Sequence, residues 1–263
     1  DLDAAAIDAF DSCQVISRYG IGVDNIDTEA AAERDIPVTN VPDYCLEEVS
    51  MHALSMFLAL SRGLTNYDAN VAVGGWDRDA AVPIHRFSTQ TVGVVGSGAI
   101  GRAVGERAAA LGADVVASDP FLTQDDVADD PATLLEFEEV LARSDFITVH
   151  SPLTPETRGL FDADAFAQMA DSAYFVNVAR GPIVDDDALL DALYDDEIAG
   201  AGLDVFPEEP PTPDHPLRDH PDVITTPHVA WYSEEANEQR RHTVTDIVRT
   251  VLEGGEPENV VND

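Results

Sequence analysis

The sequence predicts an α/β protein built around a doubly wound parallel sheet. From Thr91 onward, short runs of β-branched and small apolar residues alternate with helical segments, a pattern typical of a parallel sheet with helices on both faces. The predicted strands are TVGVV, DVVAS, FITVH, AYFVNV, AGAGLDV and VITT, which begin at residues 91, 114, 146, 173, 199 and 223. Helices are expected at about residues 100–111, 134–142 and 187–194.

The region ahead of Thr91 has a different texture. Two short strands, 13–18 and 37–41, lie on either side of the turn-rich stretch YGIGVDNID. Apolar residues then recur at helical spacing over 46–73, which predicts one long helix stopped by the Gly74-Gly75 pair. A last helix over 234–252 follows the sheet, so we expect it to pack back on the first region.

The composition is strongly acidic. Asp and Glu number 51 against 14 arginines and no lysine, for a net charge of −37. The acidic residues are spread through segments with regular apolar spacing. We therefore expect them to lie on the surface of a folded protein and not in a disordered tail. Nucleic-acid and anionic-membrane binding rely on clustered cations, which this chain lacks, so neither partner is expected.

The remaining bulk features point to a cytoplasmic protein. The two cysteines, Cys13 and Cys45, offer one disulfide at most and no metal-type spacing, so no metal site is expected. No apolar run is long enough to span a bilayer. The charge favours a high-salt cytoplasm, since salt screens the repulsion between surface carboxylates.

A glycine-rich turn predicts a dinucleotide site. The sequence G-S-G-A-I-G follows the strand at 91–95 and opens a helix, the context that this fingerprint requires. The glycines permit a tight turn, and the free N–H groups of the helix start can receive a pyrophosphate. Asp119 ends the next strand, where its carboxylate can bind a ribose diol and would repel a 2′-phosphate, so NAD is favoured over NADP. The cofactor-binding residues predicted here are Gly96, Gly98, Ala99, Ile100, Gly101 and Asp119.

These patterns predict two domains. Residues 83–228 form a Rossmann cofactor domain. Residues 1–82 form the first part of a smaller, flavodoxin-like substrate domain, to which the C-terminal helix in residues 229–263 returns. The substrate domain is therefore discontinuous in sequence, and an active site is expected in the cleft between the domains, with hinge closure on the bound cofactor.

Three residues after the glycine-rich turn have the chemistry for hydride transfer to a keto acid. Arg180 and His228 end predicted strands, and Glu209 lies in the loop DVFPEEP. The reaction needs a cation for the substrate carboxylate, a proton donor for the carbonyl oxygen and a group that tunes that donor. Each residue alone also has a structural reading, as a surface ion pair, a solvated charge or a strand end, but the three together favour catalysis.

The order of these motifs resembles the D-isomer-specific 2-hydroxyacid dehydrogenases, from about Val15 to the C-terminus. NVARGPIVDDDAL, AGAGLDVFPEEP and TTPHVAW look like the family's signature blocks, and PHVAWYSEEA resembles its C-terminal-binding-protein branch. The resemblance implies an oxidoreductase that moves hydride between NAD(H) and the C2 position of a small 2-keto or 2-hydroxy acid, D-isomer expected. It also implies a homodimer joined through the cofactor domains.

Two alternatives stay open at this point. One is an NAD(H)-sensing regulatory protein, as the C-terminal-binding-protein likeness permits, in which turnover is incidental. The other is a different hydride donor on the same scaffold, such as formate or phosphite. Family members begin with a strand and helix ahead of the region matching Leu2, so we expect either a fragment or an unusually small substrate domain.

The resemblance also assigns roles to single residues. Arg180 would bind and polarise the substrate, His228 would be the general acid and base, and Glu209 would hydrogen-bond the histidine and favour its imidazolium form. Glu209 is preferred to Glu208 because the family's glutamate directly precedes a proline, here Pro210. Further cofactor contacts are expected from His150, Pro152, Val178, Ala179 and Asp204, and substrate contacts from Arg18, Ile21, Gly22 and Trp231.

One position departs from the family pattern. Ala99 stands where relatives often carry a basic residue, which predicts a weaker pyrophosphate contact unless Arg102 or salt compensates. Substrate specificity is expected to depend on the side chains of Tyr19, Tyr44 and Trp231.

The acidic composition yields a first prediction about stability. The melting temperature should climb steeply when KCl is raised from about 0.1 M to several molar, because screening removes the self-repulsion of the folded surface. A thermal melt followed by circular dichroism at each salt concentration measures this, and a flat profile would refute the high-salt interpretation.

Overall fold

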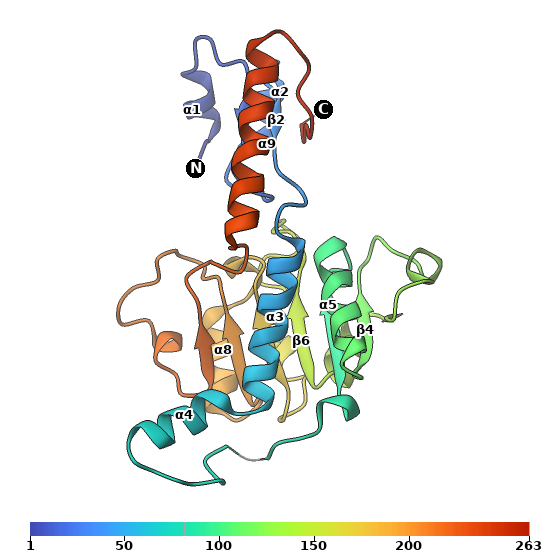
Figure 1. Cartoon of the computed structure of the whole chain (residues 1–263), viewed down its shortest axis with the longest axis vertical. Helices are drawn as coiled ribbons and strands as arrows, with labels where there is room; N and C mark the ends of the chain where they lie inside the picture. Colours follow the sequence, from blue (N-terminus) through green and yellow to red (C-terminus); the bar gives the residue numbers. More distant parts are fainter. Residues whose placement is uncertain (82, 263) are drawn as a thin grey trace. The chain divides into compact units, whose positions relative to one another are not determined.

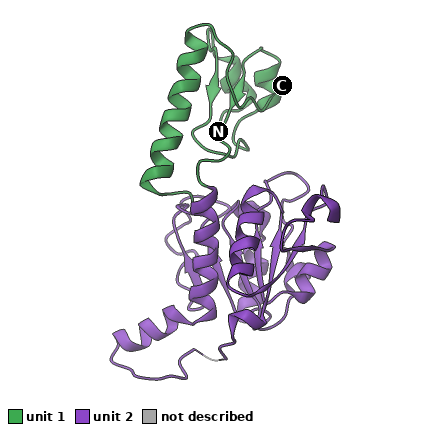
Figure 2. Cartoon of the chain, turned by 45° about the vertical axis from the view of Figure 1, so that its right-hand side comes forward, with its two compact units in different colours: residues 1–45, 231–263 green, residues 46–230 purple. Residues whose placement is uncertain are grey.

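The computed structural model describes residues 1–81 and 83–262 and divides into two compact units. Unit 1 combines residues 1–45 with 231–263, and unit 2 comprises residues 46–230 (Figure 2). Because each unit has its own core, we describe them one after the other.

Unit 2 is built on a seven-stranded parallel sheet, which confirms the α/β doubly wound fold class. The strands are β3 Thr91–Val95, β4 Asp114–Ser118, β5 Thr133–Leu134, β6 Phe146–Val149, β7 Tyr174–Asn177, β8 Gly200–Leu203 and β9 Val223–Thr225. They lie in the order β5-β4-β3-β6-β7-β8-β9, and each neighbouring pair is parallel. The strand order therefore reverses between β3 and β6, and ligands of such sheets bind at the carboxyl ends of the strands beside that point.

Helices cover both faces of the sheet. The helices of unit 2 are α3 Leu46–Ser61, α4 Leu64–Ala72, α5 Ala99–Ala110, α6 Phe137–Arg143, α7 Ala163–Phe166 and α8 Asp186–Tyr194, with 3-10 turns η1 Phe87–Thr89, η2 Gln124–Val127, η3 Gly181–Ile183 and η4 Pro216–Arg218. Figure 1 shows α3 and α5 side by side in front of the strands. Phe161 lies at the centre of the core on the other face, 4.7 Å from Phe175 and 6.2 Å from Phe166 between ring centroids. Burial of these rings ties α7 to the sheet.

The prediction of one helix over 46–73 is wrong in one respect, because this segment forms two helices. Gly63 adopts a left-handed conformation, with φ +57°, and a Cβ at this position would overlap the Cβ of Ala81. The chain turns here because glycine alone accepts this conformation without steric cost. In the same way, the helix expected over 134–142 begins only at Phe137, since Leu134 belongs to the short edge strand β5.

The expected domain boundary near residue 82 also differs from the structure. Residues 46–82 were assigned to the N-terminal substrate domain, but α3 packs against α5, β7 and β8 of the sheet. Phe57 of α3 is fully buried, and its ring lies 5.3 Å from that of Phe146 in β6. The amphipathic pattern identified the helix but not the layer against which its apolar face packs.

Unit 1 is small and joins both ends of the chain. It contains α1 Ala4–Asp8, β1 Ile16–Ser17, α2 Thr28–Ala32, β2 Val38–Thr39 and α9 Glu234–Leu252. β1 and β2 pair in parallel, and both are shorter than expected. The side chain of Asn262 accepts a hydrogen bond from Val38 N (2.7 Å), and Thr39 bridges Val260, so the C-terminal segment is tied to this sheet. The last helix has the bounds that the sequence predicts.

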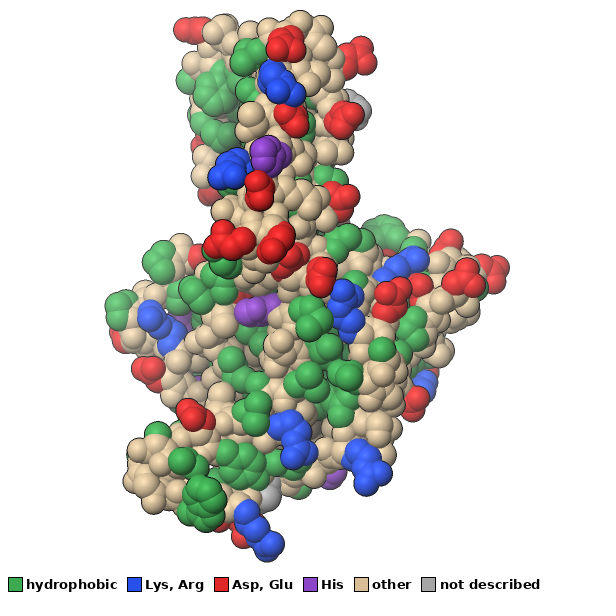
Figure 3. Space-filling view, in the orientation of Figure 1, with side chains coloured by type: hydrophobic (Ala, Val, Ile, Leu, Met, Phe, Trp, Pro, Cys, Tyr) green, Lys and Arg blue, Asp and Glu red, His purple; other side chains and the backbone are tan. Residues whose placement is uncertain are grey.

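The surface carries the expected charge pattern. Figure 3 shows acidic side chains scattered over the visible face of both units, with arginines between them. Within residues 1–81 and 83–262, no helix is long and apolar enough to cross a membrane, and no cluster of metal-ligating side chains is found. Cys13 and Cys45, both within the described residues, are not joined by a disulfide.

Candidate active site

The glycine-rich turn after β3 is tight on one side and open on the other. A Cβ on Gly101 would overlap the carbonyl oxygen of Gly96, and Gly96 itself has φ +92°. Gly98, the N-cap of α5, has no heavy atom within 4 Å of the place where a Cβ would stand. The geometry therefore fits a dinucleotide, because close helix–strand contact and open access for a pyrophosphate are what the fingerprint glycines supply.

Asp119 lies beside this turn. Its Oδ2 accepts a hydrogen bond from Ser97 N (2.9 Å), and its Oδ1 accepts one from Phe121 N (3.0 Å). The carboxylate at the end of β4 is thus fixed by the backbone of the glycine-rich loop. This is the position from which a carboxylate can bind the ribose of a dinucleotide.

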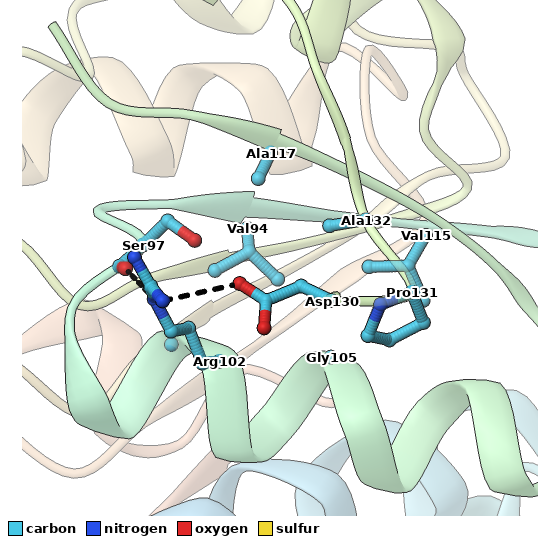
Figure 4. A pocket seen from close by; sticks show the side chains of 10 residues that line it. Val94, Ser97, Arg102, Gly105, Val115, Ala117, Asp130, Pro131 and Ala132 are labelled. Carbon is cyan, nitrogen blue, oxygen red and sulfur yellow. Dashed lines mark hydrogen bonds and ion pairs between the residues drawn. The ribbon is translucent and has the colours of Figure 1, made fainter. Parts of the chain in front are cut away.

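Arg102 supports the loop from below (Figure 4). Its Nε donates to the carbonyl oxygen of Ser97 (2.9 Å), and its Nη1 lies 3.4 Å from Oδ2 of Asp130. These groups line a small pocket between α5 and the strands β3 and β4. The guanidinium therefore contacts the loop backbone and Asp130, and these contacts stabilise the turn. Ala99 itself provides no cation at this turn.

Four residues expected to line the cofactor lie at the carboxyl ends of neighbouring strands. His150 and Pro152 follow β6, and Val178 and Ala179 follow β7. Burial lowers the pKa of His150 to about 3, so its ring is neutral at neutral pH, and its Nε2 lies 2.9 Å from the hydroxyl of Thr148. A histidine held neutral in this way cannot store a proton for catalysis at neutral pH, which agrees with a lining role.

His228 and Glu209 form a close pair after β9 and β8. Nδ1 of His228 lies 2.6 Å from Oε2 of Glu209, while Oε1 of Glu209 accepts a hydrogen bond from Phe206 N (3.1 Å). Both carboxylate oxygens are therefore used, one to orient the imidazole and one to fix the glutamate. Glu209, and not the adjacent Glu208, is the residue that contacts the histidine.

A buried carboxylate holds the turn that carries His228. Asp204 is 1% exposed, and its side chain accepts hydrogen bonds from Val229 N (2.9 Å), Ala230 N (2.8 Å) and the hydroxyl of Thr226 (2.5 Å). Its backbone oxygen accepts a further bond from His228 N (2.8 Å). Sequence reasoning assigned Asp204 only to the cofactor and missed its support of this turn.

This support matters because His228 has an unfavourable backbone conformation. Its φ is +53°, in the left-handed region that non-glycine residues rarely occupy. Such a conformation costs on the order of 1–3 kcal/mol and persists only where surrounding bonds determine it. His52 of α3 adds a further bond to the network, with Nε2 3.0 Å from the hydroxyl of Thr226. Neither Thr226 nor His52 was predicted; the threonine directly before the PH dipeptide was the available signal.

Arg180 is positioned by close backbone packing. A Cβ on Gly181 would overlap the backbone of Phe206, so the loop after β7 lies directly against the loop that carries Glu209. The carbonyl oxygen of Arg180 accepts a hydrogen bond from Asn177 Nδ2 (2.9 Å), and its Nη1 donates to Ala179 O (2.8 Å). The loops of Arg180, Glu209 and His228 thus follow three adjacent strands, at one edge of the sheet.

The predicted carboxylate cradle lies in unit 1. The carbonyl oxygens of Ile21 and Gly22 accept hydrogen bonds from Asn40 Nδ2 (2.8 Å) and Arg18 Nε (3.0 Å), and that of Gly20 accepts one from Val41 N (3.0 Å). Among the described residues, no hydrogen bond uses the N–H groups of Ile21 and Gly22. With its carbonyls anchored, the loop presents unpaired donors of the kind that bind a carboxylate.

Comparisons with known proteins agree with this geometry. Residues 54–230 match the model described as "D-isomer specific 2-hydroxyacid dehydrogenase, NAD binding domain". The chain is 40% identical over 261 residues to a D-3-phosphoglycerate dehydrogenase of Mycobacterium leprae, covering 99% of this chain and 49% of that protein. It is 38% identical to a glycerate dehydrogenase of Methylorubrum extorquens, covering 94% of this chain and 78% of the relative. The chain thus spans about half the length of the phosphoglycerate dehydrogenases that it matches.

Solved structures are similar over nearly the whole chain. A glyoxylate reductase from Paecilomyes thermophila has a TM-score of 0.91 at 29% identity, covering 99% of this chain and 79% of that one. A D-lactate dehydrogenase from Aquifex aeolicus, complexed with NAD and lactic acid, has a TM-score of 0.89 at 28% identity, with coverages of 96% and 80%. These relatives are metabolic dehydrogenases, so the comparisons do not support the regulatory alternative. The chain belongs to the D-isomer-specific 2-hydroxyacid dehydrogenase family, and its central part is that family's NAD-binding domain.

Proposed function

We propose that this protein transfers a hydride between NAD(H) and the C2 position of a small 2-keto or 2-hydroxy acid of the D series. The observation that carries the proposal is the pair of His228 and Glu209, 2.6 Å apart, on the edge of the sheet where ligands bind. Arg180 follows the strand next but one to that of His228. A proton donor, its orienting carboxylate and a cation for the substrate are therefore contributed by three adjacent loops.

When bound, NADH would supply the hydride for reduction, and NAD⁺ would accept it for oxidation. The turn at Gly98 and the N-terminus of α5 would hold its pyrophosphate, and Asp119 would hold its adenosine ribose. The same carboxylate would repel a 2′-phosphate, which favours NAD over NADP. His150, Pro152, Val178, Ala179 and Asp204 stay the proposed lining of the nicotinamide and adenosine sides.

His228 would supply the proton. Because Glu209 holds Nδ1, the proton passes from Nε2 to the carbonyl oxygen as C2 of the keto acid receives the hydride. The carboxylate of Glu209 stabilises the imidazolium before transfer. In the oxidation direction the neutral ring would take the hydroxyl proton.

Substrate binding would use cations and backbone donors. In unit 2, Arg180 would bind the carboxylate and polarise the carbonyl. In unit 1, the N–H groups of Ile21 and Gly22 and the side chain of Arg18 would contribute carboxylate contacts, with Trp231 beside the substrate. The relatives include phosphoglycerate, glycerate and lactate dehydrogenases, so the candidate acids differ mainly in the group attached to C2.

The direct test is oxidation of NADH by purified protein in high KCl. The acids are glyoxylate, hydroxypyruvate, 3-phosphohydroxypyruvate, pyruvate, 2-ketoisocaproate and phenylpyruvate, with NADPH in parallel. We expect turnover of at least about 1 per second on one of them with NADH, the ordinary range of enzymes. Once a preferred acid is found, His228→Asn should lower kcat on that acid by about 10²–10⁴-fold and leave the Kd of NADH nearly unchanged. A His228→Asn variant that keeps most of its activity would refute the acid–base role.

The neighbouring glutamates provide a matched pair of variants. Glu209→Gln should lower kcat by about tenfold or more, because the amide cannot stabilise the imidazolium. Glu208→Gln removes the same charge one residue away and should leave kcat within about twofold. Steady-state kinetics on the preferred acid measure both, and equal effects of the two substitutions would contradict the specific role of Glu209.

We also propose a homodimer joined through unit 2. Helix α4 buries none of its residues, and large apolar side chains are exposed on it and just after it: Leu64, Val71, Val73 and Trp76, which are 55%, 52%, 86% and 92% exposed. Such a patch is expected to lie against another chain. Light scattering should give the mass of a dimer, and Val73→Asp should shift it towards the monomer; a monomeric parent protein would refute the proposal.

We also propose that the protein functions in a high-salt cytoplasm, because salt screens the repulsion between its many surface carboxylates. This proposal is tested by the salt dependence of the melting temperature.

A further inference from the structure

One arginine of unit 1 is enclosed by aromatic rings. Cζ of Arg240, on α9, lies 3.8 Å from the ring centroid of Tyr19 and 3.9 Å from that of Trp231. The ring of Tyr44 lies 5.5 Å away and makes a third wall. All three distances are within the range in which a guanidinium is attracted to an aromatic face.

The surroundings of Arg240 differ from those of an ordinary surface arginine. Its neighbour Arg241 has a 63% exposed side chain and lies 4.0 Å from a carboxylate oxygen of Glu238. No ion pair of Arg240 is found among the described residues, although the chain carries 51 acidic residues. Its Nε is buried without a hydrogen-bond partner, a cost that the stacking must offset. The position of this side chain is therefore set by the rings and by hydrogen bonds, and not by an ion pair within the described residues.

Two of the three rings, those of Tyr19 and Trp231, belong to segments that we propose to bind the substrate. Tyr19 directly precedes the cradle residues Gly20 to Gly22, and its carbonyl oxygen accepts a hydrogen bond from Nη1 of Arg240 (3.4 Å). Trp231 lies three residues after His228 along the chain. Nη2 of Arg240 donates to Oδ1 of Asn237 (3.1 Å), which fixes the guanidinium to its own helix. The stack thus connects the cradle loop, the tryptophan and α9.

We propose that Arg240 is a positioning residue for substrate binding, which fixes the rings of Tyr19 and Trp231. Through these rings it sets the placement of the cradle donors, the N–H groups of Ile21 and Gly22, and the surface that contacts the substrate side chain. This inference rests on the proposed function. A planar guanidinium can stack between two rings while its edges donate hydrogen bonds, and a lysine ammonium cannot do both. Loss of the stack should therefore weaken keto-acid binding and change selectivity between acids, while NAD binding in unit 2 is spared.

The experiment uses the two tryptophans of the chain. Trp76→Phe keeps an aromatic side chain in the patch proposed for the dimer contact and leaves Trp231 as the sole tryptophan, so its fluorescence reports on the stack. Light scattering confirms that this background has the mass of the unsubstituted protein. In this background we compare Arg240→Met, Arg240→Lys and the control Arg241→Met. For each protein we measure acrylamide quenching of Trp231, the Kd of the unreactive keto-acid analogue oxamate from Trp231 emission, the Kd of NADH, and the KM and kcat on the preferred acid.

Arg240→Met should raise quenching of Trp231 and should raise the KM and the oxamate Kd by about tenfold, as expected for loss of two stacking contacts. Its kcat and NADH Kd should stay within about twofold of the parent. Arg240→Lys should lie between Arg240→Met and the parent, and Arg241→Met should match the parent in every quantity. A thermal melt confirms that each variant is folded under the assay conditions.

Two results would overturn the proposal. One is an Arg240→Met protein that matches Arg241→Met in quenching and in oxamate Kd. The other is a parallel loss of kcat, NADH affinity and oxamate affinity in both Arg240 variants, which would indicate general damage to the fold. If the parent protein turns over no acid, the proposed function fails, and the oxamate and quenching measurements still test the stack separately.

Discussion

The proposed catalytic site depends on the hydrogen bonds to the buried carboxylate of Asp204. Asp204 accepts hydrogen bonds from two backbone N–H groups and from Thr226, and its own carbonyl oxygen binds His228 N. Desolvating a carboxylate is costly unless such donors surround it, so the side chain and the turn over 226–230 stabilise one another. This turn holds His228 in the left-handed conformation, in which its imidazole contacts the carboxylate of Glu209. A non-glycine residue in this strained conformation is typical of functional sites.

Direct backbone packing sets the rest of the geometry. Gly181 allows the loop of Arg180 to lie against that of Glu209, and Gly101 allows α5 to approach the end of β3. At both places a single methyl group would overlap main-chain atoms, so close backbone packing sets the spacing of the loops of Arg180 and Glu209 and of the glycine-rich turn. Gly98 provides the opposite property, because it leaves space for a ligand. The parallel sheet then brings these separately packed loops to one edge.

Much of this organisation could be predicted from the sequence, because it depends on local patterns. Strand runs, the bounds of the last helix and the glycine turn follow from periodicity and from the steric demands of glycine. The split at Gly63 could not be read from apolar spacing, since it depends on the left-handed backbone of Gly63, where a side chain would overlap Ala81 further along the chain. For the same reason the bonds of Asp204 and the ring stack around Arg240 were missed: they join residues that are distant in sequence. The roles of Arg180, Glu209 and His228 rested on motif resemblance, and the structure adds the contact between the last two.

In the proposed reaction, a hydride moves between the cofactor and C2 of a keto acid bound to this chain. The most direct measurement is the fate of the label when the protein reduces its preferred keto acid with NADH deuterated at C4 on the transferred side. We expect a D-2-hydroxy acid that carries the deuterium at C2, detected by mass spectrometry and nuclear magnetic resonance. A hydroxy acid without deuterium at C2, or no product from a protein that binds both NADH and the keto acid, would contradict it.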